Sequence, residues 1–239
     1  MTKRPPVTLY SRLRDRIAAD IAAGVWKPGE AIATEASLSA LHDVAIATVR
    51  RAVDDLVSDG LVERVAAVGT FVKRPTFEVA SIRAMRCYGS AADKRTPGSR
   101  IVERSLLQAP RNVSDALKLV LKAEVIRLVR LRFEADAPVA VEEIWLHAQR
   151  FRGLLSAPEA HPPLMYPFYE SGFGEIVARV EETVAISIAD SADATALGVV
   201  VGAPIVLLDR LALGYDGRPV EWRRVRASAS DFHYKIEIR

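Results

Sequence analysis

The chain has a single cysteine, no long apolar run and little net charge. That cysteine, Cys87, excludes a disulfide within the chain, which agrees with a reducing cytoplasm. No window approaches the roughly 20 apolar residues of a membrane-spanning helix, and the charged stretch 1–16 lacks the apolar core of a signal peptide. A net charge of +3 permits a nucleic-acid partner without requiring one. We therefore expect a cytoplasmic protein that does not bind membranes.

Residue patterns of catalysis, metal binding and phosphate binding are also missing. No glycine-rich phosphate loop follows an expected strand, and the acidic stretches 181–182 and 190–193 suit helix caps or solvated positions better than catalysis. The four histidines lack the spacing of metal ligands; they are His42, His147, His161 and His233. We therefore expect no metal, no cofactor and no enzymatic activity.

The length of 239 residues suits two domains, and half of the residues are hydrophobic, which is enough for two cores. Pro75 ends the first predicted unit. The stretch 88–100, YGSAADKRTPGSR, is small, polar and charged, as flexible connectors are. We therefore expect a first domain (1–75), a linker (76–100) and a second domain (101–239). The alternative is that this stretch is a surface loop of a single domain.

The first domain begins with a predicted helix that Thr8 caps. Its apolar residues recur every four positions, as on the buried face of a helix; they are Leu9, Leu13, Ile17 and Ile21. A second, short helix is predicted over residues 35–41. Thr34 caps it, and we expect its Leu38 and Leu41 to face inward.

A third predicted helix, residues 45–59, is the element around which this domain is organised. Val49, Val53 and Leu56 fall on one face of it. Gly60 follows where a helix needs a left-handed residue. Two short strands around a tight turn come next and form a wing. Together these elements predict a winged helix-turn-helix, whose third helix contacts DNA; the alternative is a surface helix of a small helical bundle.

The motifs of this domain resemble those of the GntR family of bacterial transcription regulators. The resemblance covers residues 8–74 and rests on PGE at 28–30, on TVRRAVDDLVSDGLVER at 48–64 and on GTFV at 69–72. It implies that the domain binds operator DNA. We assign the DNA contacts to these residues: Thr34, Glu35, Ala47, Thr48, Arg50, Arg51, Gly69, Thr70 and Lys73.

The chain departs from the family at three positions that are usually basic, where it has Ala36, Ile46 and Val68. Arg50 remains of that set. Basic side chains supply most of the non-specific affinity for DNA, and an arginine that bonds guanine contributes ~1–3 kcal/mol of discrimination. We expect weak operator binding that depends on Arg50 and its neighbours, with Ile46 against thymine methyl groups. The alternative is a protein that has partly lost operator binding.

The second domain is predicted to be an antiparallel sheet with few helices, so the whole chain belongs to the α+β class. Asp216-Gly217 between two alternating runs is a strong hairpin signal. The predicted strands are 101–107, 124–134, 139–147, 175–189, 204–215, 219–228 and 232–238. The predicted helices are 112–121, which Asn112 or Ser114 caps, 166–171, which Gly172 ends, and 191–198.

A weak internal repeat runs through this domain at an offset of 80 residues. Over 116–136, eight of 21 residues are identical to those 80 positions later, and Arg130 matches Arg210 in this way. Each copy would contain a helix, a turn, a strand, a tight turn and a second strand. We expect two halves related by a pseudo-two-fold axis, with a cavity between them. The alternative is chance similarity between two hairpins.

Residues 100–239 are similar to the UTRA effector-binding domain of the HutC branch of GntR regulators. The similarity rests on Arg130-x-Arg132, Pro138-Val139-Ala140, Asp216-Gly217-x-Pro219-Val220-Glu221 and Phe232-x-Tyr234. It implies a chorismate-lyase-like fold without catalysis, a small-molecule inducer and a homodimer. We assign the effector contacts to Arg130, Arg132, Glu142, Tyr166 and Phe232.

Arg130 and Arg132 lie two positions apart on one predicted strand, so both guanidinium groups project from the same face. Two like charges there need an anion or a carboxylate, and Glu142 on the returning strand is close enough to be one partner. This pattern fits an anion clamp in an effector pocket. It equally fits a solvated face with cross-strand ion pairs.

The expected effector follows from two departures from relatives that bind phosphorylated sugars. Those relatives usually have Ser-Leu before the tyrosine at position 166, and this chain has Leu164-Met165. Their Arg-x-Asp near the C-terminus is Ser-Ala-Ser at 228–230. We therefore expect a carboxylate with an apolar body rather than a phosphate.

These patterns predict an effector-responsive transcription regulator, a repressor that a small molecule releases from operator DNA. One alternative is a small-molecule-binding protein with weakened DNA binding. Another is an enzyme of the chorismate-lyase type, but it does not account for residues 1–75.

Overall fold

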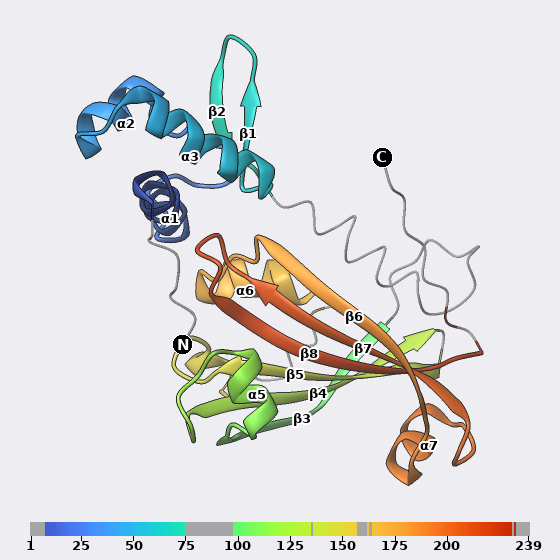
Figure 1. Ribbon diagram of the computed structural model, residues 1–239. Coiled ribbons are helices and arrows are strands. Elements are labelled where there is room, and N and C mark those ends of the chain that lie inside the picture. Colours follow the sequence, from blue (N-terminus) through green and yellow to red (C-terminus); the bar gives the residue numbers. More distant parts are fainter. Residues whose placement is uncertain are drawn as a thin grey trace, which may run out of the picture. The chain divides into compact units, whose positions relative to one another are not determined.

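The computed structural model describes residues 8–74, 98–134, 136–156, 162, 164–230 and 232. These residues fall into two compact units, one with three helices and a hairpin and one built on a larger sheet (Figure 1). The predicted linker, 76–100, lies outside the described residues except for 98–100. Those three residues already belong to the first strand of the sheet, so the second unit begins earlier than we predicted.

The N-terminal unit is a winged helix-turn-helix, as predicted. Its elements are α1 (Leu9–Ala22), α2 (Glu35–His42), α3 (Ile46–Ser58), β1 (Val62–Val65) and β2 (Gly69–Val72). The hydroxyl of Thr34 accepts a hydrogen bond from the amide of Ser37 and so caps α2. α3 buries one apolar face against α1 and α2. β1 and β2 pair antiparallel and form the wing.

Three expectations for the first two helices were wrong. Leu9 is 57% exposed, because it opens α1 and the buried residues of this helix begin one turn later, at Leu13. Leu41 is 71% exposed, because only Leu38 of the two-turn α2 is buried. Thr8 occupies the N-cap position of α1, but its hydroxyl donates to Ser11 Oγ and caps no backbone amide.

The C-terminal unit is a six-stranded antiparallel sheet with the strand order β3-β4-β5-β8-β7-β6. The strands are β3 (Gly98–Gln108), β4 (Glu124–Glu134), β5 (Ala137–His147), β6 (Arg179–Ile188), β7 (Pro204–Leu213) and β8 (Pro219–Ser228). The helices are α5 (Arg111–Ala116), η1 (Arg152–Leu154), α6 (Met165–Phe173) and α7 (Ser191–Leu197). The predicted α+β class is therefore confirmed.

The two halves of the sheet have the same strand order, each counted from its own edge toward the centre. β3, β4 and β5 correspond to β6, β7 and β8, and α5 corresponds to α7. The register follows the offset of 80 residues as well, because Gln108 pairs with Glu124 and Ile188 pairs with Pro204. Both halves contain the helix and the hairpin that a duplicated unit requires. The cavity between the halves remains a prediction.

The two faces of the sheet have different covers. On the inner face, as we call it, α6 and η1 pack on apolar residues of the four strands β4, β5, β7 and β8. On the outer face, α5 packs against Trp145 and Trp222, and both tryptophans are buried. α7 packs at the other end of the outer face, beside Val141 and Ile205.

Several local predictions for this unit need correction. α5 ends at Ala116, well before Leu121, and Pro110 takes the N-cap position that we expected for Asn112 or Ser114. α6 continues to Phe173 because the left-handed residue that ends it is Gly174, with a φ of 69°, and not Gly172. Of the strand predicted at 232–238, only Phe232 lies within the described residues. No described helix is long and apolar enough to cross a membrane.

Candidate DNA interface and effector site

The predicted DNA-contacting residues lie on the three elements that a winged helix-turn-helix turns toward DNA. Thr34 and Glu35 open α2, and Ala47, Thr48, Arg50 and Arg51 lie on the first half of α3. Gly69 and Thr70 open β2, and Lys73 follows it. Ala47, Arg50 and Lys73 are exposed, whereas Thr48 and Thr70 are half-buried.

Glu35 joins the recognition helix to strand β1 of the wing. Its Oε2 lies 3.1 Å from both Nε and Nη2 of Arg50, and its Oε1 accepts from Arg64 Nη2 at 3.3 Å. Arg64 also pairs with Asp54 on α3. The charges of Arg50 and Arg64 are therefore partly neutralised by carboxylates of the same domain. The sequence motif indicated a DNA contact for Glu35, but not this contact with Arg50.

Arg51 turns toward α1. Its guanidinium carbon lies 4.1 Å from the centre of the Tyr10 ring, which is a cation–π contact. This contact ties α3 to the first turn of α1. The position of Arg51 thus supports a role in packing, and its assignment to DNA remains a prediction.

Three further exposed positions of the expected interface are apolar. Ile46 at the start of α3 and Val68 at the tip of the wing are exposed, and Ala36 on α2 is exposed as well. Exposed aliphatic side chains at these positions can contact thymine methyl groups but cannot pair with phosphates.

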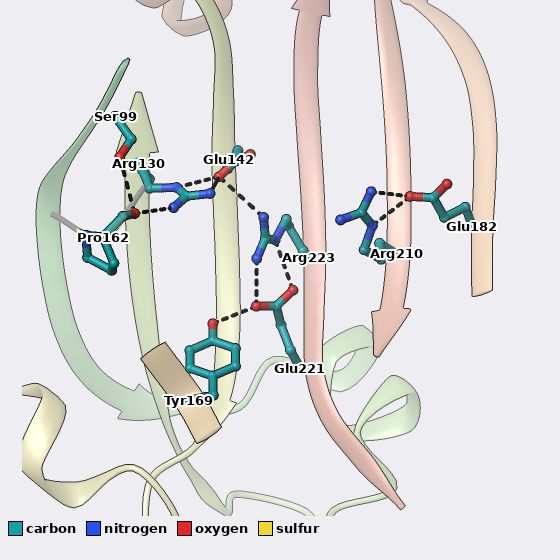
Figure 2. Close-up of polar contacts among 9 residues, drawn as sticks. All are labelled: Ser99, Arg130, Glu142, Pro162, Tyr169, Glu182, Arg210, Glu221 and Arg223. Atoms are coloured by element: carbon teal, nitrogen blue, oxygen red, sulfur yellow. Dashed lines mark hydrogen bonds and ion pairs between the residues drawn. The ribbon is translucent and has the colours of Figure 1, made fainter. Parts of the chain in front are cut away.

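The predicted effector residues lead to a buried polar network on the inner face of the sheet (Figure 2). We define the buried network as the following charged and phenolic residues: Arg130, Glu142, Arg210, Glu221, Arg223, Tyr166 and Tyr169. Arg130 is opposite Glu142 in the β4–β5 ladder, and Arg210 is opposite Arg223 in the β7–β8 ladder. Tyr166 and Tyr169 reach the same face from α6. Arg132 is fully buried on this face too, beside Ala140 of β5.

Arg130 makes two kinds of contact at the β4 side of the network. Its Nε and Nη2 both lie 2.5 Å from Oε2 of Glu142. Its Nη1 donates to the carbonyl oxygen of Pro162 at 3.0 Å, and Ser99 Oγ donates to the same carbonyl at 3.2 Å (Figure 2). Arg130 therefore connects the sheet to the crossover segment that precedes α6.

Arg223 is the centre of the network. It binds Glu221 through two parallel hydrogen bonds of 2.9 and 2.8 Å, and its Nη1 lies 3.5 Å from Glu142 Oε2. The hydroxyl of Tyr169 donates to Glu221 Oε2 at 2.5 Å. This chain of contacts joins β5, β8 and α6 (Figure 2).

Arg210 extends the network toward the edge of the sheet. It donates to Oε1 of Glu182 on β6. The ring of Tyr166 lies 5.8 Å from the guanidinium carbon of Arg223. Tyr166 thus joins the network through Arg223 of β8.

Burial and the surrounding charges shift the pKa values of the network in definite directions. Burial acts to raise the pKa of Glu142, but the nearby charges of Arg130, Arg223 and Arg132 outweigh it, so its pKa lies far below the ordinary value. Burial, together with the charge of Glu221, raises the pKa of Tyr169 well above its usual value. Glu142 is therefore ionised and Tyr169 is a hydrogen-bond donor at neutral pH.

Four of the five predicted effector residues lie on or beside this network. Phe232 instead packs on Ala140, Leu208, Val225 and Ala227, an apolar cluster farther along the same face. Prediction missed Glu221, Arg223, Tyr169 and Arg210. The sequence contained a signal for Arg210, because the internal repeat matches it with Arg130. The sequence contained no signal for Arg223, because only the β5–β8 pairing brings this residue next to Glu142.

Comparison with known proteins agrees with this architecture. The family described as "UTRA domain" matches residues 92–233, and the family described as "Bacterial regulatory proteins, gntR family" matches residues 9–72. The ligand-binding domain of a GntR-family transcriptional regulator from Bordetella bronchiseptica has a similar structure, with a TM-score of 0.55 and 31% identity. The match covers 60% of this chain and 92% of that one.

Two full-length relatives are transcriptional repressors by name. A fructoselysine utilization operon repressor of Escherichia coli O157:H7 is 27% identical over 214 residues, which are 89% of this chain and 87% of the relative. The repressor NagR of Bacillus subtilis (strain 168) is 25% identical over 224 residues, which are 92% of this chain and 90% of NagR. The UTRA match alone spans more than half of the sequence, and so the chain belongs to the GntR family of bacterial regulatory proteins, in the group that has a C-terminal UTRA domain.

Proposed function

We propose that this protein is a repressor that leaves its operator DNA when a small molecule binds the UTRA domain. The observation that carries the proposal is the union, in one chain, of a GntR-type winged helix-turn-helix with a UTRA domain. The names of the two relatives support repression as the sign of regulation. A repressor of this kind acts on bacterial DNA, so we place the protein in the cytoplasm. We propose that it binds a palindromic site as a homodimer.

We place the effector site at the buried network. Four arginines and two glutamates are buried on this face, and Glu182 at its edge adds a third carboxylate. Among the described residues at the network and its edge, there are thus four guanidinium groups and three carboxylates. That surplus favours an anionic ligand. Met165 is buried beside the network and brings an apolar wall. We therefore keep a carboxylate with an apolar body as the effector class.

Thermal shift measurements test the effector class. Aromatic and aliphatic carboxylic acids should raise the melting temperature, and sugar phosphates should not. Arg130→Ala should abolish the shift, whereas Arg224→Ala on the outer face should keep it. Stabilisation by the phosphates alone would contradict the proposal. Turnover of chorismate that Arg130→Ala abolishes would instead favour a chorismate-lyase-type enzyme.

A gel-shift series at increasing salt tests DNA binding. We use the promoter region of the protein's own gene as the probe and expect weak binding with a shallow salt dependence. Ile46→Arg should raise the affinity and add roughly 0.9 to the slope of log K against log salt, which is the effect of one further phosphate contact. Ile46→Gln is the matched control without the charge.

The second candidate function is a ligand-binding protein whose DNA binding has decayed. The apolar side chains at Ala36, Ile46 and Val68, together with the carboxylate partner of Arg50, favour it. Under this candidate, the wild-type protein gives no shift at any salt concentration, although the acids still stabilise it.

A further inference from the structure

The first two turns of α3 present an aliphatic side chain and a cation on one exposed side. Ile46, the first residue of the helix, is 47% exposed, and the side chain of Arg50 is 63% exposed. Residues four positions apart lie on the same side of a helix, roughly 6 Å apart along its axis. Ala47 beside Ile46 is exposed as well. This end of the recognition helix therefore has an apolar tip with a guanidinium group one turn behind it.

The neighbouring charged residues of α3 are directed elsewhere. The guanidinium group of Arg51 lies over the ring of Tyr10 on α1. Asp54, one turn after Arg50, pairs with Arg64 of β1. Of the two arginines of α3, Arg50 is therefore the one whose charge lies beside the apolar tip.

Glu35 determines which edge of Arg50 can meet another molecule. Its Oε2 lies 3.1 Å from both Nε and Nη2 of Arg50, so it occupies one of the two edges on which a guanidinium group forms paired hydrogen bonds. Glu35 is itself anchored by Arg64. These contacts leave the other edge of Arg50, which Nη1 and Nη2 form, for a second partner. Arg50 is thus oriented before that partner arrives.

The major groove of DNA offers a partner for each of the two groups. Thymine presents its C5-methyl group there, and guanine presents O6 and N7 to the paired N–H groups of an arginine. Base pairs are stacked roughly 3.4 Å apart, so the axial separation of Ile46 and Arg50 spans about two base pairs. A phosphate could replace guanine on Arg50, but it offers no apolar surface to Ile46.

We propose that Ile46 and Arg50 together read a methyl-bearing pyrimidine within two base pairs of a guanine in the operator. The proposal rests on the proposed function, because it requires α3 to enter the major groove. The methyl group belongs to thymine or to 5-methylcytosine, which present the same apolar surface. Because covering a methyl group adds no phosphate contact, it increases sequence discrimination without making the salt dependence steeper.

The first experiment removes every thymine methyl group from the promoter region of the protein's own gene. This DNA is amplified with dUTP in place of dTTP, and gel shifts compare the two probes at one salt concentration. The wild type should bind the uracil probe about fourfold more weakly for each methyl group that Ile46 covers. Ile46→Ala should lose this preference. The matched control, Leu9→Ala, removes an exposed aliphatic side chain from α1 and should keep it.

Each other outcome of this experiment has a definite meaning once circular dichroism shows that the variants are folded. Equal binding of both probes by the wild type would overturn the proposal. A preference that Ile46→Ala retains would overturn it too, because the methyl groups would then act through the shape of the DNA. No shift of either probe would refute DNA binding and this readout together. If the preference is present but no carboxylic acid releases the protein from the promoter, the effector proposal fails and the readout stands.

The second experiment locates the two bases. Single thymines are replaced by uracil, and single guanines by 7-deazaguanine, which lacks N7. A thymine that matters to the wild type but not to Ile46→Ala should lie within two base pairs of a guanine that matters to the wild type but not to Arg50→Gln. At that thymine, 5-methylcytosine opposite guanine should weaken binding less than cytosine does. A larger separation, or equal loss with and without the methyl group, would overturn the proposal.

Discussion

The two faces of the UTRA sheet hold similar numbers of ion pairs in very different surroundings. On the inner face, the side chains of Arg130 and Glu142 are 1% and 6% exposed. On the outer face, those of Arg224 and Asp209 are 34% and 35% exposed, although their two hydrogen bonds of 2.7 Å have good bidentate geometry. Geometry alone therefore does not distinguish the two networks; burial does. A buried pair that loses one partner leaves an uncompensated charge, whereas water replaces a lost partner at the surface.

The largest effect should come from Glu221. Glu221→Ala removes the two hydrogen bonds between Arg223 and Glu221 and the acceptor of Tyr169, all within the core. We expect the free energy of unfolding to fall by roughly 3–5 kcal/mol in urea denaturation. Glu221→Gln, which keeps the volume, should lose less and serves as the folded reference. A loss below about 1 kcal/mol for Glu221→Ala would make the inner face equivalent to the outer one.

A double change separates stability from ligand binding. Arg130→Met leaves Glu142 without its nearest partner and should destabilise the protein, whereas adding Glu142→Leu should restore part of the loss, because a buried ion pair can often be replaced by apolar residues. Both variants should lose the response to acids in thermal shift. If the double variant were less stable than Arg130→Met alone, the effects of Arg130 and Glu142 on stability would not be coupled as we expect.

The pH dependence of stability should include a contribution from Glu142 on the inner face. The folded-state pKa of Glu142 lies far below its ordinary value of 4.5, so the stabilisation that it supplies is fully present above about pH 4.5. It is lost as the pH falls below that value, because the unfolded chain then binds the proton first. Urea denaturation from pH 7 to 3 should show a shallower acid loss for Glu142→Gln than for wild type. If stability fell equally steeply with pH in Glu142→Gln and in the wild type, this prediction would be contradicted.

The smallest effect should come from the outer face. Arg224→Ala breaks the ion pair with Asp209, but both groups remain accessible to water. We expect a loss of about 0–1 kcal/mol that shrinks at high salt. Arg224 also lies 5.2 Å from the Trp222 ring, so Arg224→Lys, which keeps a cation there, is a suitable companion variant. A loss as large as that of Glu221→Ala would remove the distinction between the two faces.

Prediction from the sequence was most successful where local pattern decides the structure. Alternation placed β4 at 124–134 with the bounds that the structure has, and the offset of 80 indicated the duplicated halves. The sequence predicted that Arg130 and Glu142 lie close together in a hairpin, but the register shift between Arg132 and Phe133 decides that they are opposite each other. Boundaries failed where a single residue decides them, as at Gly174 instead of Gly172.

The sequence by itself determined the family, the helices and strands, and the face of the sheet on which Arg130 and Arg132 lie, because periodicity and motifs are local properties. Only the tertiary structure decided that Arg223 and Glu221 complete the buried network, because the β5–β8 pairing joins residues about 80 positions apart. It likewise decided that Glu35 pairs with Arg50. Each of these depends on which strands and helices become neighbours, and no local pattern records that.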